Sequence, residues 1–173
     1  MSLVTEVYHE PQKLWRCALH TVNGILGRPA YSVQDFDAIS EGLDSRRLLN
    51  RHRVLCVGYY DANVVMVALD RCGCDVDWHD KRLGTKGLFD DSARLMGFIL
   101  NVRKAGWFWW GKHWLGIRRA DDGTFWCVDS YLDKPYRFRD VDTVNNFIEH
   151  AQQDNGAVLI VKKKQKERDD SIT

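Results

Sequence analysis

QKLWRCALH, residues 12–20, is the stretch that decides how the rest of the chain is interpreted. Apolar residues recur at helical spacing directly after Cys17, at positions 18, 22, 25 and 26, so a helix is predicted to begin at the cysteine. A thiolate in the first turn of a helix faces unpaired backbone N–H groups and the positive end of the helix dipole. These conditions lower a thiol pKa, which makes Cys17 a candidate nucleophile.

Composition limits the class of protein. The 173 residues are 45% hydrophobic and 28% charged, which suits one domain with a single core. A formal net charge of +1 argues against the broad basic surface of a nucleic-acid-binding protein. We expect no membrane span, because no apolar run is long enough, and residues 1–6 do not resemble a secretory signal. Because no secretory signal is expected, the five scattered cysteines are expected to be free thiols in the cytoplasm, with the nucleus as an alternative.

Helix signals dominate the first half of the chain. The first helix is predicted to end at Gly27, which Pro29 follows. Ser32 is a good N-cap for a second helix, and Asp61 for a third that ends at Gly73. The polar segment 44–53 between them is expected to be a short helix or a hairpin arm that faces solvent.

Strand signals dominate the second half. Runs at 113–118 and 124–129 flank an Asp-Gly turn, which is typical of a β-hairpin. Other elements are predicted as follows: strands at 76–78, 98–102 and 157–161, a short helix over 88–97 and a last helix capped by Asp140. Helices followed by mostly antiparallel strands indicate an α+β fold. One domain is expected over residues 1–161, followed by a charged, disordered tail at 162–173.

A cysteine nucleophile needs a general base and a third group that orients the base. His113 opens the first strand of the predicted hairpin and Asp129 ends the second, so a tight turn brings them roughly opposite each other. Asp129 is then expected to accept the Nδ1–H of His113 and leave Nε2 facing the sulfur. His20 is nearer in sequence, but a base on the nucleophile's own helix leaves little room for substrate, so we expect a packing role for it.

Gln12 completes the predicted site. Acyl transfer from cysteine builds an oxyanion, which needs hydrogen-bond donors that are held in place beforehand. The carboxamide of Gln12 is expected to supply one N–H and the backbone of Cys17 the other. A helix-borne cysteine followed in the chain by a histidine and an aspartate on strands resembles the papain-like cysteine proteases.

The segments around these residues resemble the Josephin family of cysteine deubiquitinases, and its small members more than its ataxin branch. In family order they are YHEPQ (8–12), CALHTVN (17–23), GYYDANV (58–64), GFILN (97–101), HW (113–114) and VDS (128–130). The resemblance covers nearly all of the chain and implies a papain-like fold. It assigns nucleophile, base, orienter and oxyanion donor to the same four residues. Some family members carry Asn where this chain has Asp129, which changes the pH behaviour more than the mechanism.

The resemblance also implies a substrate, which is the isopeptide bond at the ubiquitin C-terminus, and partners, which are ubiquitin and ubiquitinated proteins. Ubiquitin ends in two glycines, so a narrow cleft is expected, with Trp114 beside the base as one wall. The family's ubiquitin contacts correspond here to Ala30–Tyr31 and to Ala62 and Asn63. The reaction needs no cofactor and no metal.

Other interpretations stay open. The aromatic cluster at 107–110 fits a core or edge cluster and a hydrophobic rim for a partner equally well. Cys72 and Cys74 with His79 are interpreted as ordinary residues, because structural zinc uses paired ligand sets at wider spacing. The alternative functions are a ubiquitin-binding module with little or no turnover and a papain-like peptidase that acts on ordinary peptides.

Overall fold

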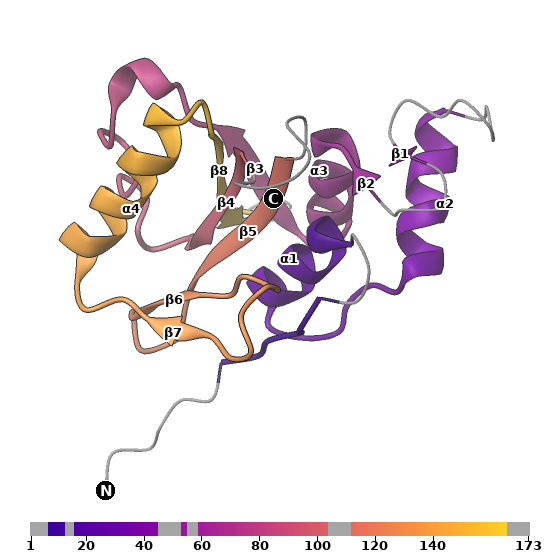
Figure 1. Ribbon diagram of the computed structural model, residues 1–173, viewed down its shortest axis with the longest axis horizontal. Helices are drawn as coiled ribbons and strands as arrows, with labels where there is room; N and C mark the ends of the chain where they lie inside the picture. The colour runs from indigo at the N-terminus through magenta and orange to yellow at the C-terminus, as the bar shows by residue number, and fades with distance from the viewer. Residues whose placement is uncertain (1–6, 13–15, 45–52, 55–58, 104–111, 166–173) are drawn as a thin grey trace, which may run out of the picture.

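The computed structural model describes residues 7–12, 16–44, 53–54, 59–103 and 112–165 (Figure 1). These residues form helices and strands in the following order: α1 (Cys17–Leu26), α2 (Val33–Leu43), β1 (Arg53–Val54), β2 (Tyr59–Tyr60), α3 (Ala62–Arg71), β3 (Cys74–Trp78), the short 3-10 helix η1 (Lys81–Leu83), β4 (Leu95–Arg103), β5 (Lys112–Arg119), β6 (Phe125–Cys127), β7 (Tyr136–Arg137), α4 (Val141–Gln153) and β8 (Ala157–Lys163).

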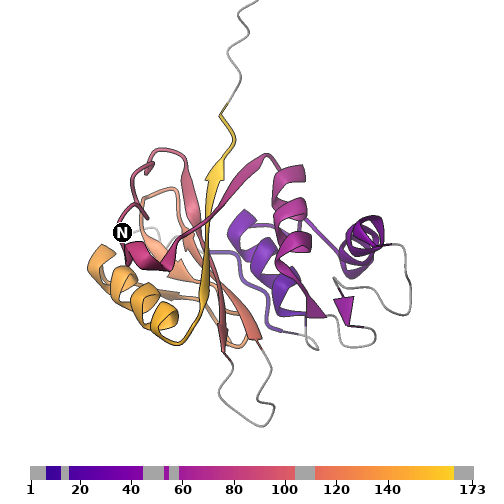
Figure 2. The ribbon, with the colours of Figure 1, turned by 90° about the horizontal axis from the view of Figure 1, so that it is seen from above.

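A six-stranded antiparallel sheet forms the middle layer. Its strand order is β3-β8-β4-β5-β6-β7, while β1 and β2 pair separately as a small antiparallel ribbon. Figure 2 shows α4 on one face of the sheet and α1, α2 and α3 on the other. The α+β class predicted from the sequence is therefore confirmed, with the early helices gathered on one face.

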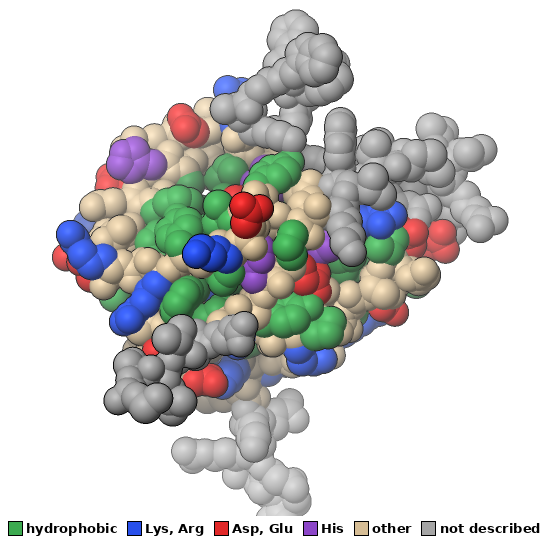
Figure 3. All heavy atoms as spheres, turned by 60° about the horizontal axis from the view of Figure 1, so that its bottom comes forward, with side chains coloured by type: hydrophobic (Ala, Val, Ile, Leu, Met, Phe, Trp, Pro, Cys, Tyr) green, Lys and Arg blue, Asp and Glu red, His purple; other side chains and the backbone are tan. Residues whose placement is uncertain are grey.

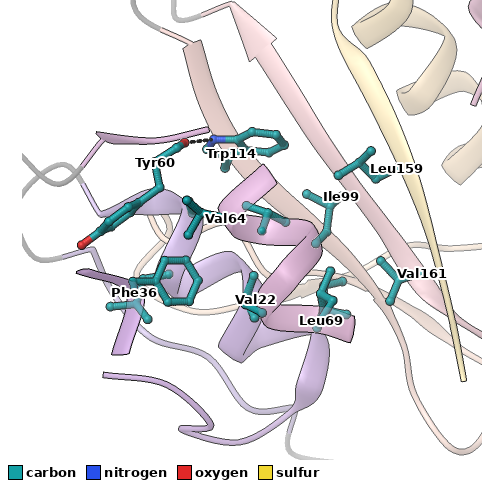
Figure 4. Close-up of a cluster of buried hydrophobic side chains, with 14 of the residues drawn as sticks. Val22, Phe36, Tyr60, Val64, Leu69, Ile99, Trp114, Leu159 and Val161 are labelled. Carbon is teal, nitrogen blue, oxygen red and sulfur yellow. Dashed lines mark hydrogen bonds between the residues drawn. The ribbon is translucent and has the colours of Figure 1, made fainter. Parts of the chain in front are cut away.

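Two apolar layers hold the helices to the sheet. The larger one lies between the sheet and helices α1–α3, and Figure 4 shows side chains from all of these elements meeting there. The second lies between the sheet and α4, where Leu100 and Val158 meet Val144 and Ile148. Burial of this apolar area stabilises the fold by roughly 25 cal/mol per Å². Because both faces of the central strands are covered, these strands are hydrophobic without alternation, as at 98–100 and 158–161.

The predicted helix ends are confirmed. Gly27 lies at the C-terminus of α1 with a left-handed φ of 71°, which favours glycine. Ser32 and Asp35 form a capping box at the start of α2, and the carboxylates of Asp61 and Asp140 accept N–H groups at the starts of α3 and α4.

The predicted helix over 88–97 is wrong. Residues up to 94 form turns, and β4 begins at Leu95. The apolar residues there pack against strands and do not form one face of a helix. Phe89, for example, packs edge-on against Phe98 on β4 and Phe125 on β6. At the last strand, β8 runs through Lys163, two residues beyond the predicted end. The segment 45–52, the aromatic cluster at 107–110 and most of the predicted tail lie outside the described residues.

Helix α1 approaches β5 very closely, and glycine makes this possible. A Cβ atom on Gly116 would lie 2.8 Å from Val128 Cγ2 and 3.2 Å from Ile25 Cδ1. Gly24 on the helix faces the same valine, at 3.1 Å for its Cβ. Val128 is β-branched and stiff, so it does not yield easily. The glycines thus set the distance between the helix of Cys17 and the strand of His113.

Replacing Gly116 with alanine is expected to lower the free energy of unfolding by about 1–3 kcal/mol, because the added methyl overpacks the contact between α1 and β5. Urea titration followed by circular dichroism measures this. Gly42 is the matched control, since a Cβ there meets nothing within 4 Å. The same substitution in α2 should raise stability by about 0.4–1 kcal/mol. Equal effects at both positions would contradict the close contact.

Candidate active site

Cys17 is the first residue of α1, as predicted. Arg16 at the N-cap provides no side-chain hydrogen bond to the helix, so no capping side chain competes for the N–H groups of the first turn. The backbone N–H of Trp114 also points at the Cys17 sulfur, at 3.5 Å. Sulfur is a weak hydrogen-bond acceptor, and this N–H lies within its reach. Cys17 is only 5% exposed, so its side chain is mostly covered.

His113 and Asp129 are in direct contact, although 16 residues separate them in the sequence. His113 Nε2 lies 2.7 Å from Asp129 Oδ1, and the imidazole is buried. The ring is turned the opposite way from the sequence prediction, which paired Nδ1 with the carboxylate. Nδ1 is instead buried without a hydrogen-bond partner among the described residues. It is therefore the nitrogen left to interact with the sulfur of Cys17.

The charge environment of His113 favours the protonated ring. Burial by itself lowers the pKa of His113, but the hydrogen bond to Asp129 and the interaction with Cys17 outweigh it and raise the pKa from 6.5 to about 9. An imidazolium beside a thiolate is the ion pair that activates cysteine hydrolases. The two partners reach His113 from different elements, the Cys17 sulfur from α1 and the carboxylate from the segment that follows β6.

The N-terminal segment 7–12 runs beside the segment 128–131 (Figure 1). Two hydrogen bonds hold Asp129 in place. The backbone N–H of Tyr131 donates to Asp129 Oδ1 at 2.9 Å, and His9 Nε2 donates to the Asp129 carbonyl at 3.0 Å. Histidine side chains lie near the middle of the face that Figure 3 turns forward, next to hydrophobic and acidic side chains. The carboxylate is thus held by the backbone of its own segment, and the Asp129 backbone is held by the neighbouring segment.

Two hydrogen bonds join Gln12 to Ser130. The Gln12 backbone N–H donates to the Ser130 carbonyl at 2.7 Å, and the Ser130 hydroxyl donates to Gln12 Oε1 at 2.9 Å. Ser130 is buried, so both bonds are shielded from water. With its carbonyl oxygen held by the serine, the carboxamide presents its NH₂ group in the remaining direction. An amide held this way suits the role of an oxyanion donor.

Glu10 ties the same N-terminal segment to α1. Its carboxylate accepts from His20 Nδ1 at 2.6 Å, from Asn23 Nδ2 at 3.1 Å and from the Tyr8 hydroxyl. Although burial raises the pKa of Glu10, the hydrogen bonds from His20 and Tyr8 outweigh it and keep that pKa below its usual range. His20 therefore takes part in positioning the segment that carries Gln12, which fits the packing role expected for it.

Trp114, the predicted wall of the cleft, has a buried side chain. Its indole is 2% exposed and packs in the apolar layer under α1 and α3, where Nε1 donates to the Tyr60 carbonyl at 3.0 Å (Figure 4). A large apolar ring at the rigid start of β5 contributes more by filling this layer than by facing water. Its backbone N–H, rather than its ring, reaches the site.

The other predicted ubiquitin contacts lie at opposite ends of α3. Ala62 and the exposed Asn63 start the helix, next to Tyr60 and hence near Trp114. The Tyr31 hydroxyl instead donates to the Ala68 carbonyl at 2.6 Å, six residues or about 9 Å further along the helix axis. Ala62 and Asn63 thus lie at the end of α3 next to Tyr60, whereas Tyr31 contacts the same helix further along.

Three contributors were missed in the sequence, namely Glu10, Ser130 and Tyr131. Ser130 and Tyr131 directly follow the predicted orienter Asp129, and this adjacency was the available signal. Among the described residues, no three His, Cys, Asp or Glu side chains cluster as metal ligands. No helix in the described part of the chain is long and apolar enough to cross a membrane. A groove of about 540 Å³ between α3 and β3, lined by Met66, Val67 and Val76 among others, contains none of the predicted site residues.

Comparisons with known proteins agree with this arrangement. The family model named Josephin matches residues 12–162. The chain is 34% identical over 160 residues to a Josephin-like protein of Arabidopsis thaliana, covering 84% of this chain and 44% of that protein. It thus spans less than half the length of that relative. It is also 34% identical over 159 residues to human Josephin-2, covering 84% and 79% of the two chains.

A solved structure supports the fold. The peptidase domain of Streptococcus ComA, described as a bifunctional ABC transporter involved in quorum sensing, superimposes with a TM-score of 0.54 at 16% identity. The match covers 92% of this chain and all of that one. At this identity the likeness concerns the fold alone. Together with the family match, it confirms the papain-like fold predicted from the sequence.

Proposed function

The chain belongs to the Josephin family and has a deubiquitinase-type cysteine protease fold, and on this premise we propose that it cleaves ubiquitin from proteins or ubiquitin chains. One observation carries the proposal most directly. A buried histidine is held by a carboxylate at 2.7 Å, and its other ring nitrogen is left for a cysteine at a helix N-terminus. This is the arrangement of an activated nucleophile, its base and an orienter.

The proposed reaction uses four residues. The thiolate of Cys17 attacks the carbonyl carbon of the last glycine of ubiquitin, and the oxyanion is bound by the Gln12 carboxamide and the Cys17 backbone N–H. The imidazolium of His113 gives its proton to the departing lysine amine, which leaves a thioester on Cys17. Water then attacks the thioester while His113 takes one of its protons, the C–S bond breaks to restore the thiolate, and the new carboxyl group of ubiquitin gives its remaining proton to solvent. Asp129 keeps the imidazole oriented and stabilises its protonated form.

A fluorogenic amide on the ubiquitin C-terminus tests the proposal. We expect turnover of this substrate and at least about a 100-fold lower kcat/KM for the same amide on the last five residues alone, because remote binding energy is used to orient the reacting bond. Equal rates on the two substrates would instead indicate a peptidase for ordinary peptides.

The alternative is a ubiquitin-binding module with little or no turnover. The small exposure of Cys17 and His113 favours it, because substrate needs access to the sulfur. A ubiquitin derivative with a C-terminal electrophile separates the two proposals. Covalent labelling of Cys17 supports the hydrolase, while tight binding without labelling supports the binding module.

Replacing Asp129 with asparagine is expected to move the alkaline limb of the kcat profile toward lower pH. The neutral amide keeps a hydrogen bond but removes the negative charge that, together with Cys17, raises the His113 pKa to about 9. Loss of such a charge is worth about one to two pH units. Measuring kcat from pH 5 to 10 tests the shift, and an unchanged alkaline limb would contradict the role of the carboxylate.

The protonation of His113 also affects the free energy of unfolding, and the direction of this effect follows from the raised pKa. Because the folded-state pKa of His113 lies above its ordinary value of 6.5, its charged interactions contribute in full below about pH 6.5. This contribution is lost as the pH rises through about 9. Asp129→Asn should therefore cost more stability at pH 6 than at pH 10, which denaturant titration at the two pH values measures.

A further inference from the structure

Tyr131 lies over the catalytic histidine of the proposed site. Its ring is stacked on the imidazole of His113, with centroids 4.2 Å apart and planes 27° from parallel. The tyrosine is 47% exposed, whereas His113 is buried. The phenol ring therefore stands between one face of the imidazole and the solvent.

The backbone of Tyr131 takes part as well. Its N–H donates to Asp129 Oδ1, the same oxygen that accepts from His113 Nε2. One residue thus contacts both the imidazole and the carboxylate that holds it. Because Asp129 and Tyr131 share one short segment, the position of the ring and that of the carboxylate are coupled.

Charged and titratable groups reach His113 from several elements. Cys17 faces it from α1, and Asp129 and Tyr131 face it from the segment after β6. Lys112 precedes it on β5 and is exposed, and His9 on the N-terminal segment reaches it only through the Asp129 carbonyl. Among the described residues, Tyr131 is the aromatic group stacked face to face with the imidazole.

We propose that Tyr131 is a positioning residue that holds the protonated imidazole of His113 between its aromatic face and Asp129. The proposal rests on the proposed function, since it assigns a role within the same site. Two physical effects act together. The negative face of an aromatic ring attracts a cation, and the ring excludes water that would weaken the bond between His113 and Asp129.

The test is a direct titration of His113 by ¹⁵N NMR of its ring, which needs no ubiquitin and no turnover. The six histidines are separated by assigning the His113 signals with a His113→Gln variant. We expect Tyr131→Ala to lower the midpoint by about one pH unit. Tyr131→Leu should lower it by a smaller but measurable amount, because leucine still excludes water but has no aromatic face, while Tyr131→Phe should keep the wild-type midpoint.

Trp78→Ala is the control. Trp78 is an exposed aromatic residue, 55% exposed, on the edge strand β3, whereas His113 lies on β5, so the midpoint should not move. A wild-type midpoint in Tyr131→Leu would overturn the proposal, since the ring would then act only as a spacer. If Tyr131→Ala does not fold, the Leu and Phe variants still decide the question. Absence of ubiquitin cleavage with the expected NMR shifts would contradict the proposed function but not the contact that Tyr131 makes.

Discussion

Replacing Cys17 with alanine is expected to reduce cleavage of a fluorogenic ubiquitin amide by at least about 10⁴-fold, because covalent catalysis through the thioester is lost. The change removes one sulfur atom from a residue that is already buried in the apolar layer under α1. Binding of ubiquitin should therefore persist, since the sulfur contributes little surface. Steady-state kinetics measures the first effect, and isothermal calorimetry with ubiquitin measures the second.

Cys74→Ala is the matched control for this prediction. Cys74 is also buried, but it lies on the edge strand β3, and burial raises the pKa of its thiol to about 11. Such a thiol stays protonated at neutral pH and is a poor nucleophile. The control should keep its kcat and lose at most some stability. Full turnover by Cys17→Ala would show that another residue is the nucleophile.

Local signals predicted the helices and the hairpin well. Ser32, Asp61 and Asp140 cap helices because a short acidic or hydroxyl side chain reaches free N–H groups in its own turn, so the information lies within four residues. The Asp-Gly turn at residues 122–123 is a local signal of the same kind. It fixes the pairing of β5 with β6, and that register carries Asp129 toward His113. The contact between His113 and Asp129 was predictable because one tight turn separates the two strands.

The features that the sequence did not reveal depend on contacts between distant segments. The rotation of the His113 ring is set by where α1 places the sulfur, and no spacing within the hairpin encodes it. The burial of Trp114 depends on α3 and on the Tyr60 carbonyl, which local patterns do not include. Apolar residues at 88–89 suggested a helix because periodicity cannot distinguish a helical stripe from ring contacts made to another strand.

Replacing Gln12 with alanine is expected to lower kcat on the ubiquitin amide by about 10²–10³-fold, with KM nearly unchanged. The reason is that an oxyanion donor acts mainly when charge develops in the transition state, and not when substrate binds. Stopped-flow or steady-state measurements with excess substrate separate the two parameters. A matching rise in KM would mean that Gln12 holds the substrate instead.

Ser130 provides a second test of the role of the Gln12 carboxamide. Its hydroxyl is bonded to Gln12 Oε1, and its carbonyl to the Gln12 N–H, so Ser130→Ala removes the bond that orients the carboxamide and leaves the backbone bond in place. We expect about a 5- to 10-fold loss in kcat, which corresponds to one neutral hydrogen bond. In a Gln12→Ala background the same serine substitution should cost nothing further, because no carboxamide remains to be oriented. Additive losses in the double variant would mean that Ser130 supports the fold of the segment and does not direct the amide. Non-additive losses would instead show that Ser130 acts through the Gln12 carboxamide. The 2.9 Å hydrogen bond between the buried Ser130 and the half-buried Gln12 would then be what orients this amide.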